Sequence, residues 1–325
     1  MELNRNLANG LKVSIPSLEV RLKRGSSIES FHKVHAVICD TKGRVLMKAG
    51  NTNYLTFIRS SLKPFQAIPF VSSGACDYIN CGDKGLAIAC GSHSGSTTHA
   101  REVFKILWNS ELEVSNLKCP IPKSKESKLE HNCSGKHAAF LATCKKLNWP
   151  LENYLDSNHQ IQIEINRRIS EMLGIPSEEL VSSIDNCGAP TLSMTTSQMA
   201  LLYAHLGSSN NAELEKISRA MLMYPEFIAD TGRFDTELIK RSHGQVISKG
   251  GSEGIQCLSR IGEGIGLAIK VEDGSKRAKY AAAIHVIKQL EWITPTGIKE
   301  LEDIFMNFSE ITHLEVEGSL KFQEN

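Results

Sequence analysis

The spacing of hydrophobic and polar residues changes twice along this chain. Residues 27–40 carry β-branched and apolar side chains at strand-like spacing, and the turn at residues 41–43 ends in glycine, so this segment and residues 44–47 predict a hairpin. From about residue 61 to 243, apolar residues recur at helical spacing instead. At Gly244 the period returns to two, so the chain predicts strands, then helices, then strands again.

The helical middle is divided by recognisable start and stop signals. Ser96 or Thr97 is placed to cap one helix. Asp156 or Ser157 is placed to open a strongly amphipathic helix, which ends at Gly174. Further helices are predicted over residues 135–147, 196–206, 212–223 and 278–292.

Three apolar segments after Gly244 are separated by glycine-containing turns and are predicted to be neighbouring strands: residues 246–248, 255–258 and 266–271. This order of elements predicts an α+β fold, with an antiparallel sheet built from both chain ends and a helical block against it. We expect residues 1–325 to form one domain whose parts are strand-rich 15–60, helical 61–243 and strand-rich 244–290.

Composition removes several classes of function. Lys+Arg 37 against Asp+Glu 36 gives a net charge of +1, so no field of one sign favours nucleic acid or an anionic membrane. No run of about 18 apolar residues is present, and the polar start at residues 1–6 does not resemble a targeting segment. The nine cysteines are an odd number, which favours reduced thiols and a cytoplasmic protein.

Ser60 and Lys63 form the first candidate for chemistry. A serine hydroxyl needs a base to become a nucleophile, and a buried lysine with a lowered pKa can be that base. Residues three apart share one face of a helix, so the two side chains can touch, and Pro64 places them at a helix N-terminus. The same pattern also fits an ordinary surface helix.

Three further polar, small-residue-rich stretches are hard to explain by packing: residues 90–95, 131–137 and 184–190. Cys133 and Cys187 suggest a metal, although the Cys-x-x-Cys pairs of structural zinc sites are absent. His131 and His137 are possible additional ligands. The stretch 248–254 contains a lysine followed by two glycines, like the Lys-Thr-Gly element that accompanies Ser-x-x-Lys in serine β-lactamases.

Together these stretches resemble the rhizobial-type L-asparaginase family, also called asparaginase II. The resemblance runs from about residue 15 to 290 and rests on six motifs in family order: RSSLKPFQ (59–66), SHSG (92–95), HNCSGKH (131–137), DNCG (185–188), GRFDT (232–236) and KGGSEG (249–254). It implies a fold like that of serine β-lactamases and serine-dependent glutaminases, and hydrolysis of asparagine to aspartate and ammonia.

The resemblance implies two serine–lysine pairs. The first is Ser60 with Lys63, and the second is Ser92 with Lys249, for which Lys270 is a nearby rival. We expect Ser60 to attack the side-chain carboxamide and Lys63 to take its proton and pass one to ammonia. The second pair relays protons or anchors the substrate, and the two pairs could exchange roles.

The resemblance also assigns the remaining site residues. Substrate contacts are expected from Arg59, His93, Asp185 and Arg233, without a choice of which one binds the α-carboxylate or the α-amino group. A zinc ion that is not the catalytic Lewis acid is implied, with ligands Cys133, Lys136 and Cys187. A lysine ligand must be neutral, so metal occupancy should fall as pH drops.

Two positions depart from the family pattern. Ser96 stands where many relatives have an acidic residue, and Asn186 stands where many have glycine. Both are expected beside the pocket. The alternatives are a glutaminase or broader amidase of the same mechanism, and a catalytically silent zinc or amino-acid binding protein. The expected partner is a small amino-acid amide, and a homodimer is expected by resemblance only.

Overall fold

The structure is a computed structural model that describes residues 15–323, so the prediction about targeting at residues 1–6 lies outside the described part. Within it a nine-stranded antiparallel sheet runs in the order β10-β11-β1-β2-β9-β8-β7, with β3 joining β2 to β12. The strands are β1 (Leu18–Arg24), β2 (Ser27–Asp40), β3 (Val45–Ala49), β7 (Val246–Gly251), β8 (Ile255–Arg260), β9 (Ile265–Val271), β10 (Asn307–Ser309), β11 (Thr312–Glu317) and β12 (Lys321–Phe322). The predicted α+β class and the sheet built from both chain ends are confirmed.

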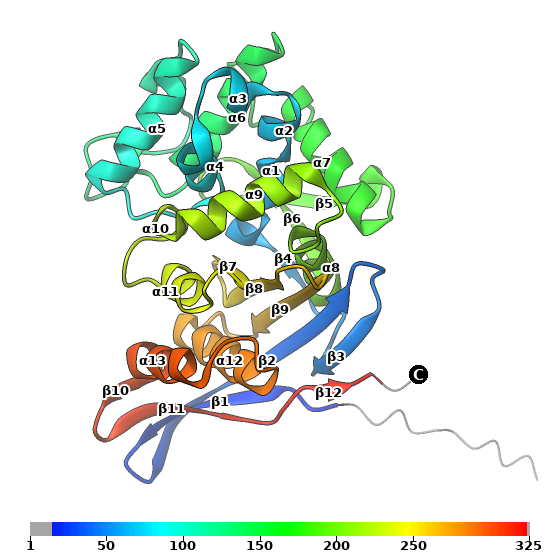
Figure 1. The fold of residues 1–325 in the computed structure, drawn as a ribbon, viewed down its shortest axis with the longest axis vertical. Helices are drawn as coiled ribbons and strands as arrows, with labels where there is room; N and C mark the ends of the chain where they lie inside the picture. Colours follow the sequence, from blue (N-terminus) through cyan, green and yellow to red (C-terminus); the bar gives the residue numbers. More distant parts are fainter. Residues whose placement is uncertain (1–14, 324–325) are drawn as a thin grey trace, which may run out of the picture.

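A helical block lies against one face of this sheet (Figure 1). Its helices are α1 (Lys63–Gln66), α2 (Ile68–Ser72), α3 (Ala75–Tyr78), α4 (Gly82–Cys90), α5 (Thr97–Asn109), α6 (Ser134–Lys146), α7 (Gln160–Leu173), α8 (Thr196–Leu206), α9 (Ala212–Met223) and α10 (Pro225–Ile228). The next helix, α11 (Phe234–Arg241), lies beside β7, and its Phe234 and Leu238 pack into the core on the opposite face of the sheet. A small second sheet of order β4-β6-β5 borders the block; its strands are β4 (Leu55–Phe57), β5 (Val181–Ile184) and β6 (Pro190–Thr195).

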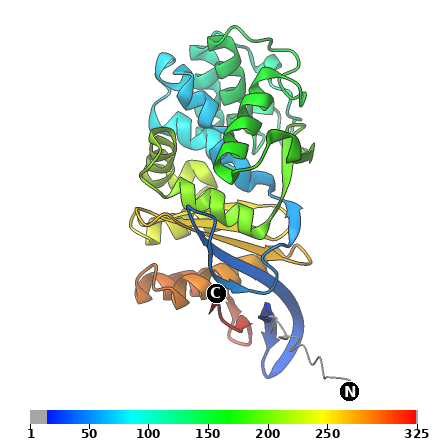
Figure 2. The same cartoon turned by 90° about the vertical axis from the view of Figure 1, so that its right-hand side faces the viewer.

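The other face of the large sheet is covered by α12 (Lys276–Gln289) and α13 (Pro295–Phe305), so the molecule has three layers (Figure 2). The second half of the central strand β2, residues 34–39, is buried on both sides. Val37 and Cys39 pack into the core of the helical block, whereas Ala36 and Ile38 pack into the core beneath α12. This alternation follows from the two-residue period of a strand, and it explains why the buried second half of β2 is mainly apolar on both faces.

Several element predictions hold at the residue level. The β2–β3 hairpin, the Ser96 cap of α5, and the bounds of α8 and α9 are confirmed. The amphipathic helix begins later than expected, because the His159 side chain rather than Asp156 or Ser157 accepts the hydrogen bond that caps α7. The strands β10, β11 and β12 lie beyond the segment predicted to be strand-rich.

Candidate active site

Ser60 lies in a 3-10 turn, η1 (Arg59–Leu62), directly before α1. Pro64 occupies the first turn of α1, as predicted, where its missing N–H removes no helical hydrogen bond. The Ser60 side chain lines a cavity of about 290 Å³. Among residues 15–323, no group forms a hydrogen bond with Ser60 Oγ. The hydroxyl is therefore free to meet a ligand in the cavity.

The Lys63 side chain does not bind Ser60, so the predicted contact within this pair is wrong. Its Nζ donates to Ser92 Oγ and to Asn132 O, each at 3.1 Å, and also to Gly91 O. Lys63 is 1% exposed, and a buried ammonium is stable only when acceptors surround it. The loops around Ser92 and Asn132 supply those acceptors, which turns the side chain toward Ser92.

Ser92 is the point where both predicted pairs meet. Lys249, on β7, donates from Nζ to Ser92 Oγ at 3.0 Å and to Gly250 O at 2.8 Å. Burial lowers the pKa of Lys63, and burial lowers the pKa of Lys249 to about 7 despite the opposing effect of the Asp235 carboxylate. Near neutral pH a lysine beside Ser92 can therefore be neutral and act as a base.

The structure also separates the two candidates for the second lysine. Lys270 lies on β9, and its Nζ donates to Glu253 O and to Val271 O, each at 2.6 Å. Its hydrogen bonds hold a turn of backbone and reach neither serine. The placement therefore favours Lys249.

Arg59 and Asp185 bind each other. The Arg59 guanidinium donates to Asp185 Oδ1 at 2.7 and 3.0 Å and to Asn186 Oδ1 at 2.9 Å, and neither Arg59 nor Asp185 is among the residues that line the cavity. Arg59 has a φ of 54°, a left-handed conformation that costs roughly 1–3 kcal/mol for a residue with a Cβ. The ion pair thus fixes a strained residue next to Ser60, and Asn186 takes part in it.

Arg233 and Asp235 do line the cavity. Arg233 donates to Ser92 O at 2.9 Å and to Ala229 O at 3.1 Å, both from NH1. Asp235 is buried, and its carboxylate accepts from Ser248 Oγ, Gly250 N and Gln256 Nε2 at 2.7–2.9 Å. Although burial alone would raise the pKa of Asp235, nearby Lys249 and the Gly250 N–H lower it. Sequence reasoning missed Asp235, although it lies within the GRFDT motif.

His93 is buried in the loop that carries Ser92, and the structure does not place it in the cavity wall. Its Nδ1 accepts from Gly95 N and its Nε2 contacts Ser134 Oγ, each at 3.1 Å. Burial holds the pKa of His93 well below its ordinary value, so the ring is neutral. These contacts indicate that His93 stabilises the conformation of the loop and does not itself bind substrate.

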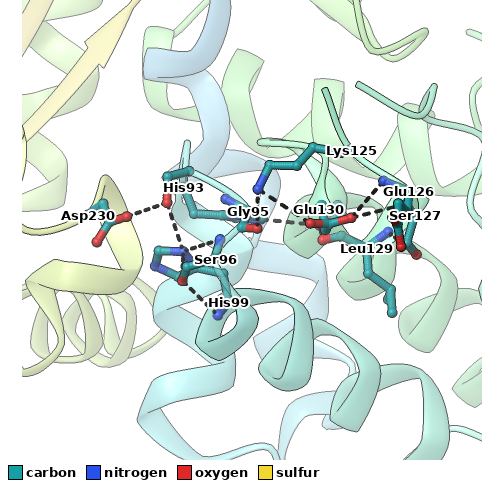
Figure 3. A network of polar contacts seen from close by, with 12 residues as sticks. His93, Gly95, Ser96, His99, Lys125, Glu126, Ser127, Leu129, Glu130 and Asp230 are labelled. Atoms are coloured by element: carbon teal, nitrogen blue, oxygen red, sulfur yellow. Dashed lines mark hydrogen bonds and ion pairs between the residues drawn. The ribbon is translucent and has the colours of Figure 1, made fainter. Parts of the chain in front are cut away.

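The rest of this loop is held by a network of polar contacts (Figure 3). Ser96 caps α5 and contacts His99 Nδ1 at 2.8 Å, so the departure from the family pattern at this position preserves a capping side chain. On the other side, Lys125 Nζ donates to Gly95 O at 3.1 Å and pairs with Glu130 at 3.4 Å. These hydrogen bonds therefore fix the conformation of the loop that carries Ser92.

The three expected metal ligands come together. Cys133, Lys136 and Cys187 are all buried, and Lys136 Nζ lies 3.3 Å from Cys187 Sγ. A hydrogen bond from Cys187 holds the pKa of the Cys133 thiol well below its ordinary value. Within residues 15–323, no three His, Cys, Asp or Glu side chains form a metal-binding group, so a site here depends on the lysine.

A comparison with known families decides the relationship. A family model described as L-asparaginase II matches residues 20–322. The chain belongs to the L-asparaginase II family. Membership confirms the resemblance seen in the sequence and supports an amidohydrolase. None of the curated proteins matches the chain. Among residues 15–323, no helix combines the length and apolar character that a membrane span needs.

Solved structures similar to this L-asparaginase II family member include glutaminase and β-lactamase-like proteins. Mglu in its native form matches with a TM-score of 0.45 and 12% identity, over 79% of this chain and 64% of that one. A Bacillus glutaminase matches with a TM-score of 0.40 and 13% identity, over 80% of this chain and 91% of that one. A β-lactamase-like protein from Bacteroides dorei matches with a TM-score of 0.35 and 11% identity, over 79% of this chain and 86% of that one. The chain thus spans under two thirds of Mglu, and similarity this weak does not establish function.

Proposed function

We propose that this protein hydrolyses the side-chain amide of L-asparagine to L-aspartate and ammonia through a serine acyl-enzyme. The observation that carries the proposal is the arrangement around one small cavity. Ser60 presents an unbonded hydroxyl to it, and Ser92 in the same wall bridges Lys63 and Lys249. The Ser60 hydroxyl can supply the nucleophile and the lysines of lowered pKa around Ser92 can supply the base, which are the two groups that acyl transfer requires.

In the proposed reaction, Ser60 Oγ attacks the carboxamide carbon and forms a tetrahedral intermediate. The two serine hydroxyls share no hydrogen bond within residues 15–323, so the proposal requires them to come into contact when substrate binds. The Ser92 hydroxyl would then pass the Ser60 proton to the lysine pair, because both lysines contact Ser92. The same proton then goes to the departing nitrogen, which leaves as ammonia. Water attacks the resulting ester, with the lysine pair again as base, and releases aspartate and free Ser60.

Ser92 is the second candidate for the nucleophile, because it has the direct lysine contacts that Ser60 lacks. Ser60 is preferred because its hydroxyl is unbonded, whereas Ser92 is already occupied by two donors. Under this assignment Ser92 is a proton relay. The location of the acyl group, on Ser60 or on Ser92, distinguishes the two roles.

A zinc ion held by Cys133, Lys136 and Cys187 also belongs to the proposal. Two buried thiols and an amine in contact fit the sulfur and nitrogen preference of zinc. Burial lowers the pKa of Lys136, but the sulfur atoms of Cys187 and Cys133 outweigh it and leave the pKa raised, so binding must displace a proton. When bound, the metal would organise the loops beside the cavity.

The test is ammonia release from asparagine and, separately, glutamine. Wild-type protein should turn over asparagine, and Ser60→Ala should lose at least about a thousandfold in rate. Ser252→Ala is the matched control, since Ser252 also lines the cavity and no hydrogen bond joins it to a lysine within residues 15–323. Turnover of glutamine alone would retain the mechanism and change the substrate. No turnover of either amide would favour a silent binding protein.

The predicted homodimer and the cytoplasmic location remain predictions. Sedimentation of the purified protein tests the first, and fractionation of the source cells tests the second.

A further inference from the structure

Lys279, which no motif singled out, is in the wall of the same cavity. It projects from α12 and is 6% exposed. Its Nζ donates to Gly251 O at 2.6 Å and to Ile255 O at 2.9 Å, at the two ends of the β7–β8 turn. An ammonium has three N–H groups, and no third acceptor is present among residues 15–323. One donor is therefore left for a ligand.

The buried charge of Lys279 also has no counter-ion. Within the described part of the chain, no carboxylate forms an ion pair with it. Asp235 acts on it only at longer range, since the Asp235 oxygens are occupied by Ser248, Gly250 and Gln256. A desolvated cation without a partner is costly, so an anion in the cavity would stabilise it.

The backbone next to Lys279 leaves room for a ligand to approach the ammonium closely. A Cβ placed on Gly250 would lie 3.0 Å from Lys279 Nζ and 3.4 Å from Asp235 Oδ2, so glycine keeps this part of the wall open to both groups. Burial lowers the pKa of Lys279 to about 8, which leaves it mostly protonated at pH 7. Lys276, one turn earlier on α12, also borders the cavity but is exposed to solvent.

We propose that Lys279 binds the α-carboxylate of the amino-acid amide, which makes it a specificity-determining residue for the proposed substrate. The inference rests on the proposed function and names the group that selects amino-acid amides over simple amides. The carboxylate would complete the third hydrogen bond of the ammonium. The side-chain amide would then extend across the cavity toward the wall that holds Ser60 and Ser92.

Calorimetric titration tests this without relying on turnover. L-aspartate and β-alanine differ only by the α-carboxylate, so each is titrated at pH 7 into wild type, Lys279→Met and Lys276→Met. Lys279→Met should weaken L-aspartate binding by about tenfold or more and leave β-alanine binding unchanged. Lys276→Met should change both by less than about threefold, because water and salt screen an exposed charge.

Lys279 also holds the β7–β8 turn, and the paired ligands separate that role from binding. A distorted turn would weaken both ligands alike, which would overturn the inference. Wild type that does not bind L-aspartate, or a loss that follows Lys276→Met instead, would overturn it as well. Ammonia release by wild type reports separately on the proposed function, so failure of one claim is distinguishable from failure of the other.

Discussion

The acid limb of the pH–rate profile should depend on Asp235. If the lysine pair beside Ser92 is the base, kcat/KM of the wild type falls as pH drops through about 7, because protonation removes the base. The limb belongs to the coupled pair of Lys63 and Lys249 rather than to either alone. The Asp235 carboxylate favours the protonated form of Lys249, so its removal should lower the lysine pKa further.

The size of this shift follows from the charges. Asp235 is the group that most raises the pKa of Lys249, and an opposite charge within roughly 4–6 Å typically shifts a pKa by about 1–3 units. The asparagine of Asp235→Asn keeps a dipole at the site, so we expect the limb to move down by about one unit. At pH 6 the variant should retain a larger fraction of its own maximum rate than the wild type retains.

The assay is ammonia release between about pH 5 and pH 9, a range that brackets the pKa of about 7 for Lys249. The readout is the pH at which the acid limb lies, not the maximum rate. Asp235→Asn also leaves the Gly250 N–H without its acceptor, so some loss of overall rate and stability is expected. Glu237→Gln is the matched control, because this carboxylate on the same helix pairs with Arg241. An unmoved limb, or one displaced to higher pH, would refute the assignment of the lysine pair as base.

Three further predictions concern separate parts of the molecule. Lys249→Met should reduce asparagine turnover by about 100-fold or more while the far-ultraviolet circular dichroism spectrum stays unchanged; retained turnover would remove this lysine from the mechanism. Zinc affinity, measured by chelator competition, should fall as pH is lowered and be lost in Cys187→Ser; a pH-independent affinity would contradict a lysine ligand. Gly95→Ala should lower the free energy of unfolding by about 3 kcal/mol or more, since the new Cβ would lie 2.1 Å from Glu130 O. Gly174→Ala, where a Cβ meets open space, should lower the free energy of unfolding by only about 1 kcal/mol. Equal losses in the two variants would contradict the steric argument.

Local patterns predicted much of the secondary structure, because periodicity and capping are local properties. The apolar spacing of α8, that of α9 and the Ser96 cap of α5 each depend on residues only a few positions apart, and the structure confirms all three predictions. The start of α7 was misplaced because histidine is an uncommon N-cap, and the side chain of His159 occupies that position.

The contacts of the site could not be predicted in the same way, because they join distant segments. Spacing alone suggested that Lys63 meets Ser60, but its acceptors come from loops at Gly91 and Asn132. Lys279 carries no sequence signal, since a lysine in the basic stretch 276–279 at the start of an alanine-rich helix has the appearance of a surface residue. Its role depends on α12 packing beside the β7–β8 turn, which only the tertiary fold specifies.

The most direct test of the account is to locate the acyl group. Wild-type protein mixed with asparagine is quenched in acid within the first turnover, and proteolytic peptides are analysed by mass spectrometry. We expect an aspartyl ester on Ser60 that is absent from Ser60→Ala. An ester on Ser92, or steady ammonia release with no ester on any serine, would contradict it.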